Sequence, residues 1–402
     1  MNPLLDLIAL GAPEKARLGV EATPAEIAQQ PEMWRDTARR FAAAAPQIRA
    51  LLSHLGLPGS DAEVVFSGAG TSDFVGRCAV GPVGAALKTR AIACPTTDIV
   101  THPDYAFPSD RPAVMVSVAR SGNSPESVAA VEIALRERPH VRHLMITCND
   151  EGALARLARA QAGQAYSLVL NPRTNDRGLA MTSSFTSMVI ASLGLAHLDD
   201  TDGFVGLVDR VADAGERVLG AAPDACAALA ERRPKRACFV GSGALIGAAV
   251  ESHLKLQEMT DGGVICLWDT FLGLRHGPRA AIHGDTLVVY YLSSDRYVRR
   301  YELDMIRSNR AQGLGMAHLV VVDRKTSELA DLADHVVEYD PQGKLTLPDH
   351  MISPVVTVVG QLLGLFASLE YGFKPDAPSA GGVISRVVEG VTIYPHDFRP
   401  KK

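Results

Sequence analysis

Continuous apolar segments alternate with amphipathic helical stretches along most of this chain of 402 residues, and this alternation limits its fold more than any other feature. Strands that are apolar along their whole length are typical of parallel sheets covered by helices on both faces. We therefore predict an α/β fold with doubly wound parallel sheets. The segments assigned to strands are residues 62–68, 113–119, 141–148, 165–171, 236–243, 285–293, 317–323 and 335–340.

Two of these strands continue in the same way. VVFSGAGTSDFVG (64–76) and CFVGSGALIGAAV (238–250) each have the pattern of a strand, a Gly-x-Gly loop and a helix. An internal repeat of this kind predicts two related α/β domains, at residues 51–215 and 216–402, joined by a helical segment. Residues 1–50 are predicted to form an N-terminal helical segment, because Thr23-Pro24 is a typical helix start and apolar residues follow at helical spacing.

The composition narrows the possible partners. The formal net charge is −5 and there is no basic tract, which argues against a nucleic-acid partner. The six cysteines are scattered without paired spacing, and no HxH or HExxH pattern occurs, so we expect no disulfide framework and no metal site. No window approaches the length of a membrane span and no cleavable leader is evident, so we expect a soluble protein of the cytoplasm with no membrane partner.

The glycine-rich turns first suggest a dinucleotide site. The turn at Gly68-Ala69-Gly70 lacks the third glycine of the GxGxxG pattern and places Asp73 where a pyrophosphate would approach. The turn at Gly241 is closer to that pattern but is one residue too long. We therefore do not expect a bound nucleotide.

The segment SVARSGNSPESVAA (117–130) lies at a strand-to-helix turn and carries hydroxyls and a cation. Backbone N–H groups at the helix start, with the hydroxyls of Ser121 and Ser124, would surround a tetrahedral anion, and Arg120 would add a charged contact. Pro125 suits the first helical position. The alternative is an ordinary helix start at which Ser124 is the capping residue.

Two further hydroxyl-rich turns lie in the same half of the chain, at residues 67–72 and 181–188. Three such helix starts exceed what capping requires, which favours the phosphate interpretation over the capping one.

Candidates for chemistry lie in the second half, in ESHLKLQEMTDG (251–262). Glu251, Lys255 and Glu258 occupy one face of a helix at positions i, i+4 and i+7. An exposed, salt-bridged face is the alternative. Because Leu254 and Leu256 leave no clean apolar stripe on the opposite side, we expect a largely buried helix whose carboxylates have a function.

His276 lies in an Arg-His-Gly-Pro turn ahead of a predicted strand. A loop histidine there can reach a ligand, and an imidazole can exchange protons with a ligand oxygen near neutral pH. The alternative is a histidine with a purely structural part in the turn.

Together these motifs resemble the sugar isomerase (SIS) domain family. The chain is most similar to the tagatose-6-phosphate ketose/aldose isomerase group, whose members are also described as galactosamine-6-phosphate deaminases/isomerases. The resemblance covers nearly the whole chain. Its matching strings are SGAGTS, SVARSGNSPES, ESHLKLQEMT and RHGP, with EIAQQPEMW, TNDRGLAMTSSFTSM, DTFLGLRHGP, RRYELDM and SRVVEGVTIYP.

The resemblance implies two tandem SIS domains, each a flavodoxin-like parallel sheet between helices, and a homodimer or larger assembly with its active site near the subunit interface. By likeness to the isomerase half of glucosamine-6-phosphate synthase, Glu258 is the base that moves a proton between C1 and C2. His276 opens the sugar ring, either in its own subunit or across the interface in a neighbouring one, while Glu251 and Lys255 orient the site. The implied phosphate ligands are Ser72, Arg120, Ser121 and Ser124, with Thr71 nearby. Further substrate-site candidates are Gly70, Thr182, Ser183, Ser184, Arg275, Arg386 and Glu389.

The sequence departs from the synthase in two ways. The synthase has a near-terminal lysine that contacts the open-chain sugar, and Glu389 stands at the corresponding position here, which counts against a Schiff-base step. The chain begins with Met1-Asn2 and so lacks the N-terminal cysteine of a glutamine-hydrolysing half. We therefore expect the catabolic direction.

The expected activity is conversion of galactosamine 6-phosphate to tagatose 6-phosphate and ammonia, with a sugar phosphate as the only small-molecule partner and with no cofactor. An aldose/ketose phosphate isomerase without deamination remains an alternative. A non-catalytic phosphosugar-binding regulator is a second alternative. The presence of Glu258 and His276 and the absence of a DNA-binding helix-turn-helix segment count against that regulator.

Overall fold

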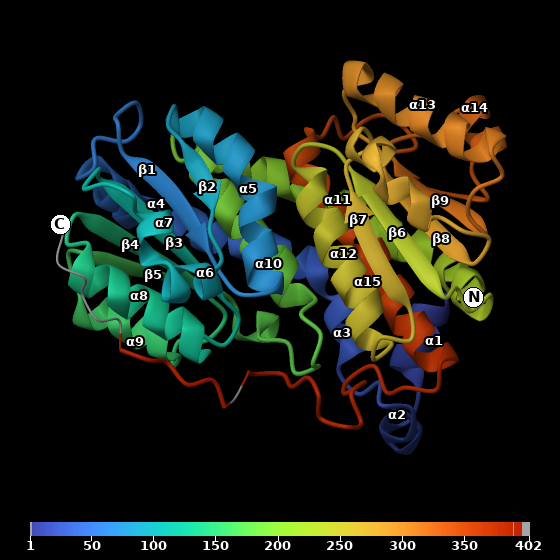
Figure 1. Ribbon diagram of the computed structural model, residues 1–402, viewed down its shortest axis with the longest axis horizontal. Helices are drawn as coiled ribbons and strands as arrows, with labels where there is room; N and C mark the ends of the chain where they lie inside the picture. The colour runs from blue at the N-terminus through green and yellow to red at the C-terminus, as the bar shows by residue number, and fades with distance from the viewer. Residues whose placement is uncertain (1, 389, 396–402) are drawn as a thin grey trace.

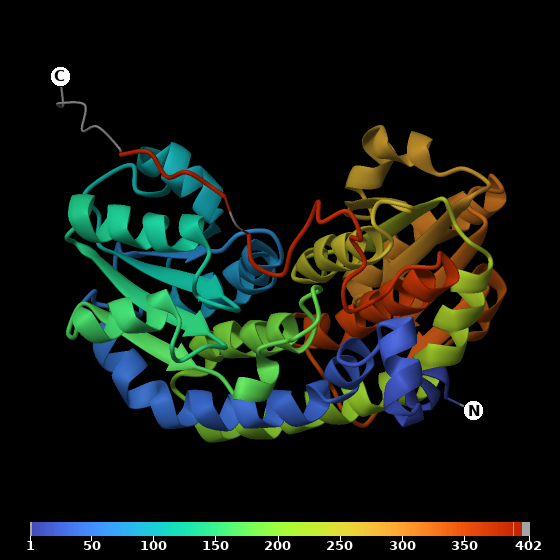
Figure 2. The ribbon, with the colours of Figure 1, turned by 90° about the horizontal axis from the view of Figure 1, so that it is seen from below.

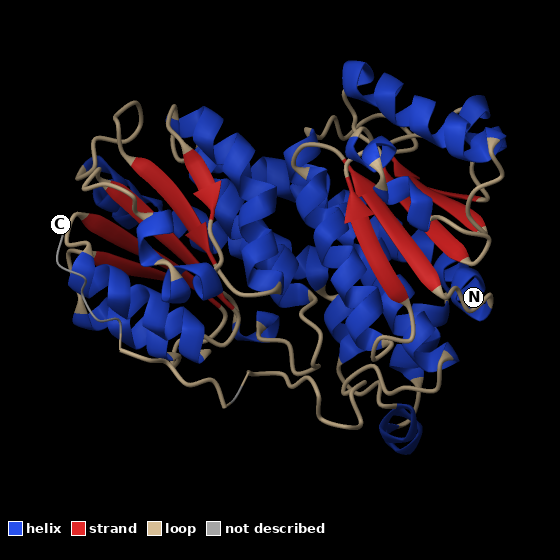
Figure 3. Cartoon of the chain, in the orientation of Figure 1, coloured by secondary structure: helices blue, strands red, loops and turns tan. Residues whose placement is uncertain are grey.

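Two five-stranded parallel sheets lie on opposite sides of the molecule, and helices fill the space between them (Figure 1, Figure 3). The computed structural model describes residues 2–388 and 390–395. The strand orders are β2-β1-β3-β4-β5 and β10-β9-β8-β6-β7. Numbered within its own domain, each sheet has the order 2-1-3-4-5, which is the flavodoxin-like arrangement. The predicted α/β class with two tandem domains is confirmed.

The strands of the first sheet are β1 Glu63–Ser67, β2 Ala91–Ala93, β3 Ala113–Ala119, β4 Val141–Thr147 and β5 Ala165–Val169. Those of the second are β6 Arg236–Gly241, β7 Ile265–Asp269, β8 Thr286–Tyr291, β9 Ala317–Val322 and β10 His335–Glu338.

The helices before and within the first domain are α1 Pro3–Ala9, α2 Ala12–Leu18, α3 Thr23–Ala28, α4 Gln30–Ser53, α5 Thr71–Leu87, α6 Thr96–Thr101, α7 Pro103–Ala106, α8 Pro125–Glu137, α9 Ala153–Ala160 and α10 Ser183–Leu193. The later ones are α11 Thr201–Glu231, α12 Leu245–Met259, α13 Arg296–Ala311, α14 Ser327–Leu332 and α15 Asp349–Glu370. Short 3₁₀ turns are η1 Pro172–Thr174, η2 Gly194–His197, η3 Gly273–His276 and η4 Pro278–Ala281.

Eight strands were predicted and all eight are present, whereas β2 and β7 were not predicted. Both lie at a sheet edge, where one side of the strand has no partner. β2 has only three residues, all half-buried, and Ile265 of β7 is 60% exposed. Neither strand is therefore fully buried, whereas the central strands β1, β3 and β8 are.

The two glycine turns have the same geometry, as the internal repeat predicts. Gly70 and Gly243 have φ angles of +54° and +56°. A Cβ atom on Gly68 would lie 2.4 Å from the backbone carbon of Ser72, and one on Gly241 would lie 2.6 Å from the carbonyl oxygen of Leu245. Each turn therefore needs a first glycine for close packing and a second for a left-handed backbone.

The helices that follow these turns, α5 and α12, cross in the centre of the molecule. A Cβ atom on Gly247 of α12 would lie 2.4 Å from the Sγ atom of Cys78 on α5, so only a glycine allows this approach. The crossing brings the start of the first domain's helix beside the second domain's candidate catalytic helix.

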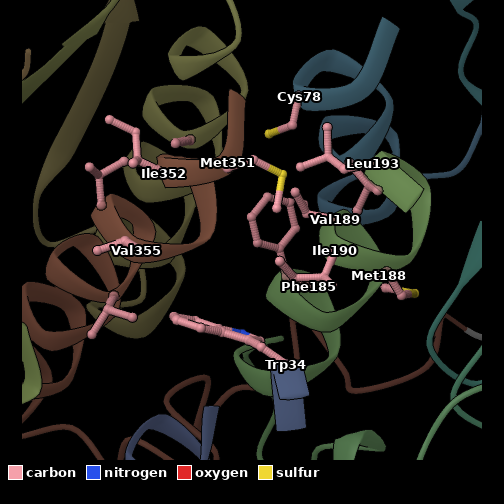
Figure 4. Packing of buried hydrophobic residues seen from close by; sticks show 14 of the residues in the cluster. Trp34, Cys78, Phe185, Met188, Val189, Ile190, Leu193, Met351, Ile352 and Val355 are labelled. Atoms are coloured by element: carbon pink, nitrogen blue, oxygen red, sulfur yellow. The ribbon is translucent and has the colours of Figure 1, made fainter. Parts of the chain in front are cut away.

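One of the apolar core clusters contains residues of both domains. Every residue of α10 is buried, and its Phe185 and Met188 lie with Met351 of α15 in the same cluster (Figure 4). Trp34 of α4 lies below them and donates a hydrogen bond of 2.8 Å from Nε1 to Thr186 Oγ1. The domains are therefore fixed relative to each other by shared packing, with the long helices α4 and α11 along one side (Figure 2).

Helix α15 corrects one expectation from the sequence. It has 22 residues, and an 18-residue window within it reaches a mean hydropathy of 1.8, so by length and composition it could cross a membrane, although we expected no such segment. In the structure 94% of that apolar stretch is buried inside the protein. The apolar character of α15 therefore reflects its place in the core between the domains.

The chain after α15 returns from the second domain to the first (Figure 1, Figure 2). Arg386 in this segment donates a hydrogen bond of 2.7 Å from Nε to the carbonyl oxygen of Asp176. The segment thus lies against the loops that follow the first sheet. The boundary that we place between residues 215 and 216 falls within the continuous helix α11.

Candidate active site

The first part of the site is the start of α5, beyond the carboxyl end of β1. Thr71 and Ser72 are the first two residues of the helix, and both side chains are more than nine-tenths buried. The left-handed Gly70 turns the backbone so that the helix N-terminus faces this edge of the sheet. Such a terminus offers unpaired N–H groups and a favourable dipole to an anion.

The second part is the turn between β3 and α8. Because β1 and β3 are paired parallel strands, this turn lies beside the first one at the same edge of the sheet. Gly122 has a φ angle of +65°, and Pro125 begins α8 as predicted. The side chain of Ser124 makes no capping hydrogen bond to α8. The capping alternative is therefore not supported, and the turn is available for another role.

These two turns and the C-terminal segment enclose a pocket of about 180 Å³. Its lining includes most of the predicted phosphate ligands, at the edge of the sheet where doubly wound folds bind ligands. The lining residues are Ala69, Gly70, Ser72, Ala119, Arg120, Ser121, Ser124, Glu126, Ser127, Met181, Arg386, Val387 and Val388. The structure therefore brings together Gly70, Ser72, Arg120, Ser121, Ser124 and Arg386.

Arg120 supports the wall of this pocket. Its Nη1 atom donates to the carbonyl oxygens of Gly178 and Leu179 at 3.2 and 3.1 Å, and Nη2 donates to the carbonyl oxygen of Arg386. Burial lowers the pKa of the guanidinium, which is only 6% exposed. These hydrogen bonds hold the loop at residues 178–179 and the C-terminal segment at the rim of the pocket.

The third hydroxyl-rich turn has a structural role that the sequence did not reveal. Asp176 accepts hydrogen bonds from the backbone N–H groups of Thr182 and Ser184 at 2.8 and 2.9 Å, and from both hydroxyls at 3.2 and 2.6 Å. The hydroxyl of Ser183 donates to the carbonyl oxygen of Glu26 at 3.3 Å. These three hydroxyls therefore hold the loop together and do not line the pocket, so their part in substrate binding stays a prediction.

Sequence reasoning missed Asp176, which organises the loop beside the pocket. It is completely buried, and this burial raises the pKa of its carboxyl. An acidic residue six positions before Thr182 was the available signal, since buried carboxylates usually accept several hydrogen bonds.

The candidate catalytic helix is α12, which presents Glu251, Lys255 and Glu258 to the start of α5. The Lys255 ammonium lies 3.2 Å from Glu251 Oε1, donates a hydrogen bond to Glu258 Oε1, and donates another of 3.1 Å to Thr71 Oγ1. Lys255 and Glu251 are only 1% and 0% exposed. The exposed salt-bridged face that we considered is therefore ruled out.

The two carboxyl groups that contact Lys255, those of Glu251 and Glu258, have different environments. Burial raises the pKa of Glu251 to about 8, although nearby Lys255 acts to lower it. At neutral pH Glu251 is therefore mainly protonated. The side chain of Glu258 is 16% exposed and forms the ion pair with Lys255. Burial alone would lower the pKa of Lys255, but its carboxylate neighbours outweigh burial and raise it.

His276 and Arg275 lie in η3, beyond the edge strand β7, and both are exposed. Among the described residues, His276 makes no hydrogen bond or ion pair, and it does not line the pocket. Glu389 lies outside the described residues. No cluster of three or more His, Cys, Asp or Glu side chains in the described part of the chain is arranged to hold a metal ion.

Comparison with known proteins gives the family. No protein-family profile matches the chain. The D-galactosamine-6-phosphate deaminase AgaS of Escherichia coli is 35% identical over 387 residues, covering 93% of this chain and 95% of that protein. Its counterpart in Shewanella sp. is 31% identical over 391 residues, covering 96% and 95%. The chain belongs to the D-galactosamine-6-phosphate deaminase AgaS family.

Solved structures place this family in the SIS fold. The tagatose-6-phosphate ketose/aldose isomerase of Escherichia coli is 33% identical, with a TM-score of 0.82 over 93% of this chain and 96% of that one. The C-terminal domain of glucosamine-fructose-6-phosphate aminotransferase from Francisella tularensis is 17% identical, with a TM-score of 0.70 over 87% and 96%, and shares the fold. The suspected SIS family is confirmed, and the family members are enzymes.

Proposed function

We propose that this protein converts D-galactosamine 6-phosphate to tagatose 6-phosphate and ammonia. The contact from Lys255 to Thr71 supports the proposal most directly, because it joins the helix that bears Glu258 to the helix that borders the anion pocket. A sugar phosphate held by its phosphate in the pocket would extend its carbonyl end toward α12. We take D-galactosamine 6-phosphate as the substrate because the family members are named for it.

In this mechanism the turns hold the phosphate. N–H groups at the starts of α5 and α8, with the hydroxyls of Ser72, Ser121 and Ser124, bind its oxygens. Thr71 holds Lys255, and Arg120 keeps the pocket rim in place. We assign ring opening to His276, which moves a proton between the ring oxygen and the hydroxyl at C1.

Glu258 then removes the proton from C2 of the open-chain aldehyde, and the C1 oxygen takes on negative charge in the transition state. The Lys255 ammonium and the protonated Glu251 are suited to stabilise that charge. Return of the proton to C1, together with transfer of one amine proton to the C1 oxygen, leaves a hydroxyl at C1 and an imine at C2. Addition of one water molecule releases ammonia and leaves the ketose phosphate. A plain aldose/ketose isomerisation would use the same proton transfer without the loss of nitrogen.

The assembly and the compartment belong to this proposal too. We infer a homodimer or larger oligomer in the cytoplasm, in which His276 enters the active site of a neighbouring copy. The exposed His276 lies close in sequence to two large apolar side chains that are also exposed, Trp268 at 37% and Leu272 at 51%. Such a surface is typical of a subunit contact.

The test is ammonia release from galactosamine 6-phosphate, compared with glucosamine 6-phosphate and with unphosphorylated galactosamine. We expect rapid release from the first compound only. Ketose formation from galactose 6-phosphate without ammonia from either amino sugar would establish the plain isomerase instead. Binding of these phosphates without turnover would favour the regulator.

A further inference from the structure

The second domain has a counterpart of the phosphate turn. In the first sheet Ser67 of β1 pairs with Ser117 of β3, and in the second Val240 of β6 pairs with Tyr290 of β8. Ser67 and Val240 each directly precede the first glycine of a Gly-x-Gly turn. Ser121 lies four residues after Ser117, and Ser294 lies four residues after Tyr290. Ser294 is therefore the counterpart of Ser121 in the second domain.

A carboxylate of the chain itself fills this counterpart turn. Asp349 Oδ1 accepts hydrogen bonds from the backbone N–H and the hydroxyl of Ser294, both at 2.7 Å. Asp349 Oδ2 accepts another from the hydroxyl of Ser293. The N–H of Ser293 donates to Glu302 Oε2 at 2.9 Å. The turn thus binds an anion with the same kinds of donor that the first domain presents to its open pocket.

Other charges surround the turn. Arg299 of α13 forms an ion pair of 2.8 Å with Asp323 and donates to the carbonyl oxygen of Ser293. Burial raises the pKa of Glu302 to about 7. These groups stabilise the turn from the side of α13, while Asp349 reaches it from the start of α15.

We propose that Asp349 is a built-in anion, which occupies in the second domain the position that the sugar phosphate takes in the first. Asp349 thereby anchors the N-terminus of α15 to this counterpart turn, which follows β8. Only one of the two repeated turns is then free for substrate, so each chain binds one sugar phosphate.

The anchor also makes Asp349 a positioning residue for the catalytic helix. α15 packs along α12: Ser353 donates a hydrogen bond of 3.2 Å to the carbonyl oxygen of Ala244. A Cβ atom on Gly364 would lie 3.0 Å from the carbonyl oxygen of Lys255, so the two helices are in contact at the catalytic lysine. A shift of α15 along its axis would therefore move Lys255 relative to Thr71.

The test is rescue by a small carboxylate. Asp349→Ala leaves the donors of the turn without an acceptor, and we expect a lower melting temperature that added formate raises by roughly 2–4 °C relative to chloride at equal ionic strength. Formate should not affect the wild type, whose turn is already filled. It should not affect Asp349→Asn either, because the amide occupies the space. Asp331→Ala on the exposed surface of α14 is the matched control.

These melting measurements need no substrate, so they do not depend on the proposed function. The activity readout does rest on it: kcat of Asp349→Ala should fall roughly tenfold and recover in formate, with KM nearly unchanged. If Asp349→Ala does not fold alone, its refolding yield in formate against chloride takes the place of the melting curve. Equal responses of Asp349→Ala and Asp331→Ala to formate would overturn the proposal.

Discussion

The ammonium of Lys255 on α12 lies 3.1 Å from the hydroxyl oxygen of Thr71 at the start of α5, and this contact joins the two domains at the candidate active site. Lys255 is only 1% exposed, so its ammonium depends on Thr71 and Glu258 for its hydrogen bonds, and Glu251 Oε1 lies 3.2 Å away. The position of the proposed proton-transfer groups is therefore tied to the position of the proposed phosphate turn.

Replacing Thr71 by valine should weaken this link. The change keeps the shape of the side chain and removes the acceptor, which leaves a buried ammonium with one partner fewer. We expect a loss of about 1–3 kcal/mol in the free energy of unfolding and a fall in kcat. Denaturant unfolding and steady-state kinetics measure both, with Thr97→Val on the exposed side of α6 as control. Unchanged stability in Thr71→Val would show that the contact contributes little.

The phosphate turn should govern substrate affinity. Ser121→Ala or Ser124→Ala removes one hydroxyl from the pocket, so we expect KM for the sugar phosphate to rise roughly tenfold while kcat changes less. The exposed Ser53→Ala serves as control. A KM that stays at the wild-type value in both pocket variants would contradict the assignment of this turn to phosphate.

The two glutamates of α12 should respond differently to amide substitution. Glu258→Gln removes the proposed base, so kcat should fall roughly 10²–10⁴-fold. Glu251→Gln replaces a carboxyl that is already protonated at neutral pH, because burial raises its pKa to about 8, and its effect should be much smaller. The comparison uses initial rates at pH 7. An equal fall in kcat in the two variants would contradict the assignment of Glu258 as the base and Glu251 as a neutral acid.

The stability of the protein should depend on the ionisation of Glu26. Burial and the nearby Asp176 raise the pKa of Glu26 to about 7, above its ordinary value near 4.5. The folded state then binds this proton more tightly than the unfolded state, so its contribution is complete below pH 4.5 and is lost as the pH rises toward 7. In Glu26→Gln the free energy of unfolding should fall less between pH 5 and 7. The measurement is denaturant unfolding at several pH values. Identical slopes in variant and wild type would refute this role.

Most of the fold could be predicted because its signals are local. The central strands are largely buried and mostly apolar, so they were identified without knowledge of their partners. β2 and β7 were missed although short apolar runs contain them, at residues 91–94 and 264–268, and in the structure both lie at a sheet edge where they are only partly covered. From the sequence we expected no segment long enough to cross a membrane, whereas α15 is long and apolar enough, and its burial between the domains shows it to be a core helix.

Only part of the candidate site could be predicted from the sequence. The residues around Ser72 and Ser121 were identified from turn chemistry, and the structure gathers them at one pocket. The turn at residues 182–184 looked the same in the sequence, yet its hydroxyls bind Asp176. Hydroxyl-rich helix starts bind either an outside anion or an internal carboxylate. Nothing local to the turn tells which of the two is present.

The sequence by itself determined the alternation of strands and helices, the repeated glycine turns and the helical spacing of Glu251, Lys255 and Glu258, because each depends on residues close together in the chain. Tertiary structure alone decided which anion each turn receives. Asp349 fills the turn at Ser294 from 55 residues away, while the turn at Ser121 stays open. The physical reason is that hydrogen-bond donors are specified locally, but their acceptors are delivered by packing between distant segments.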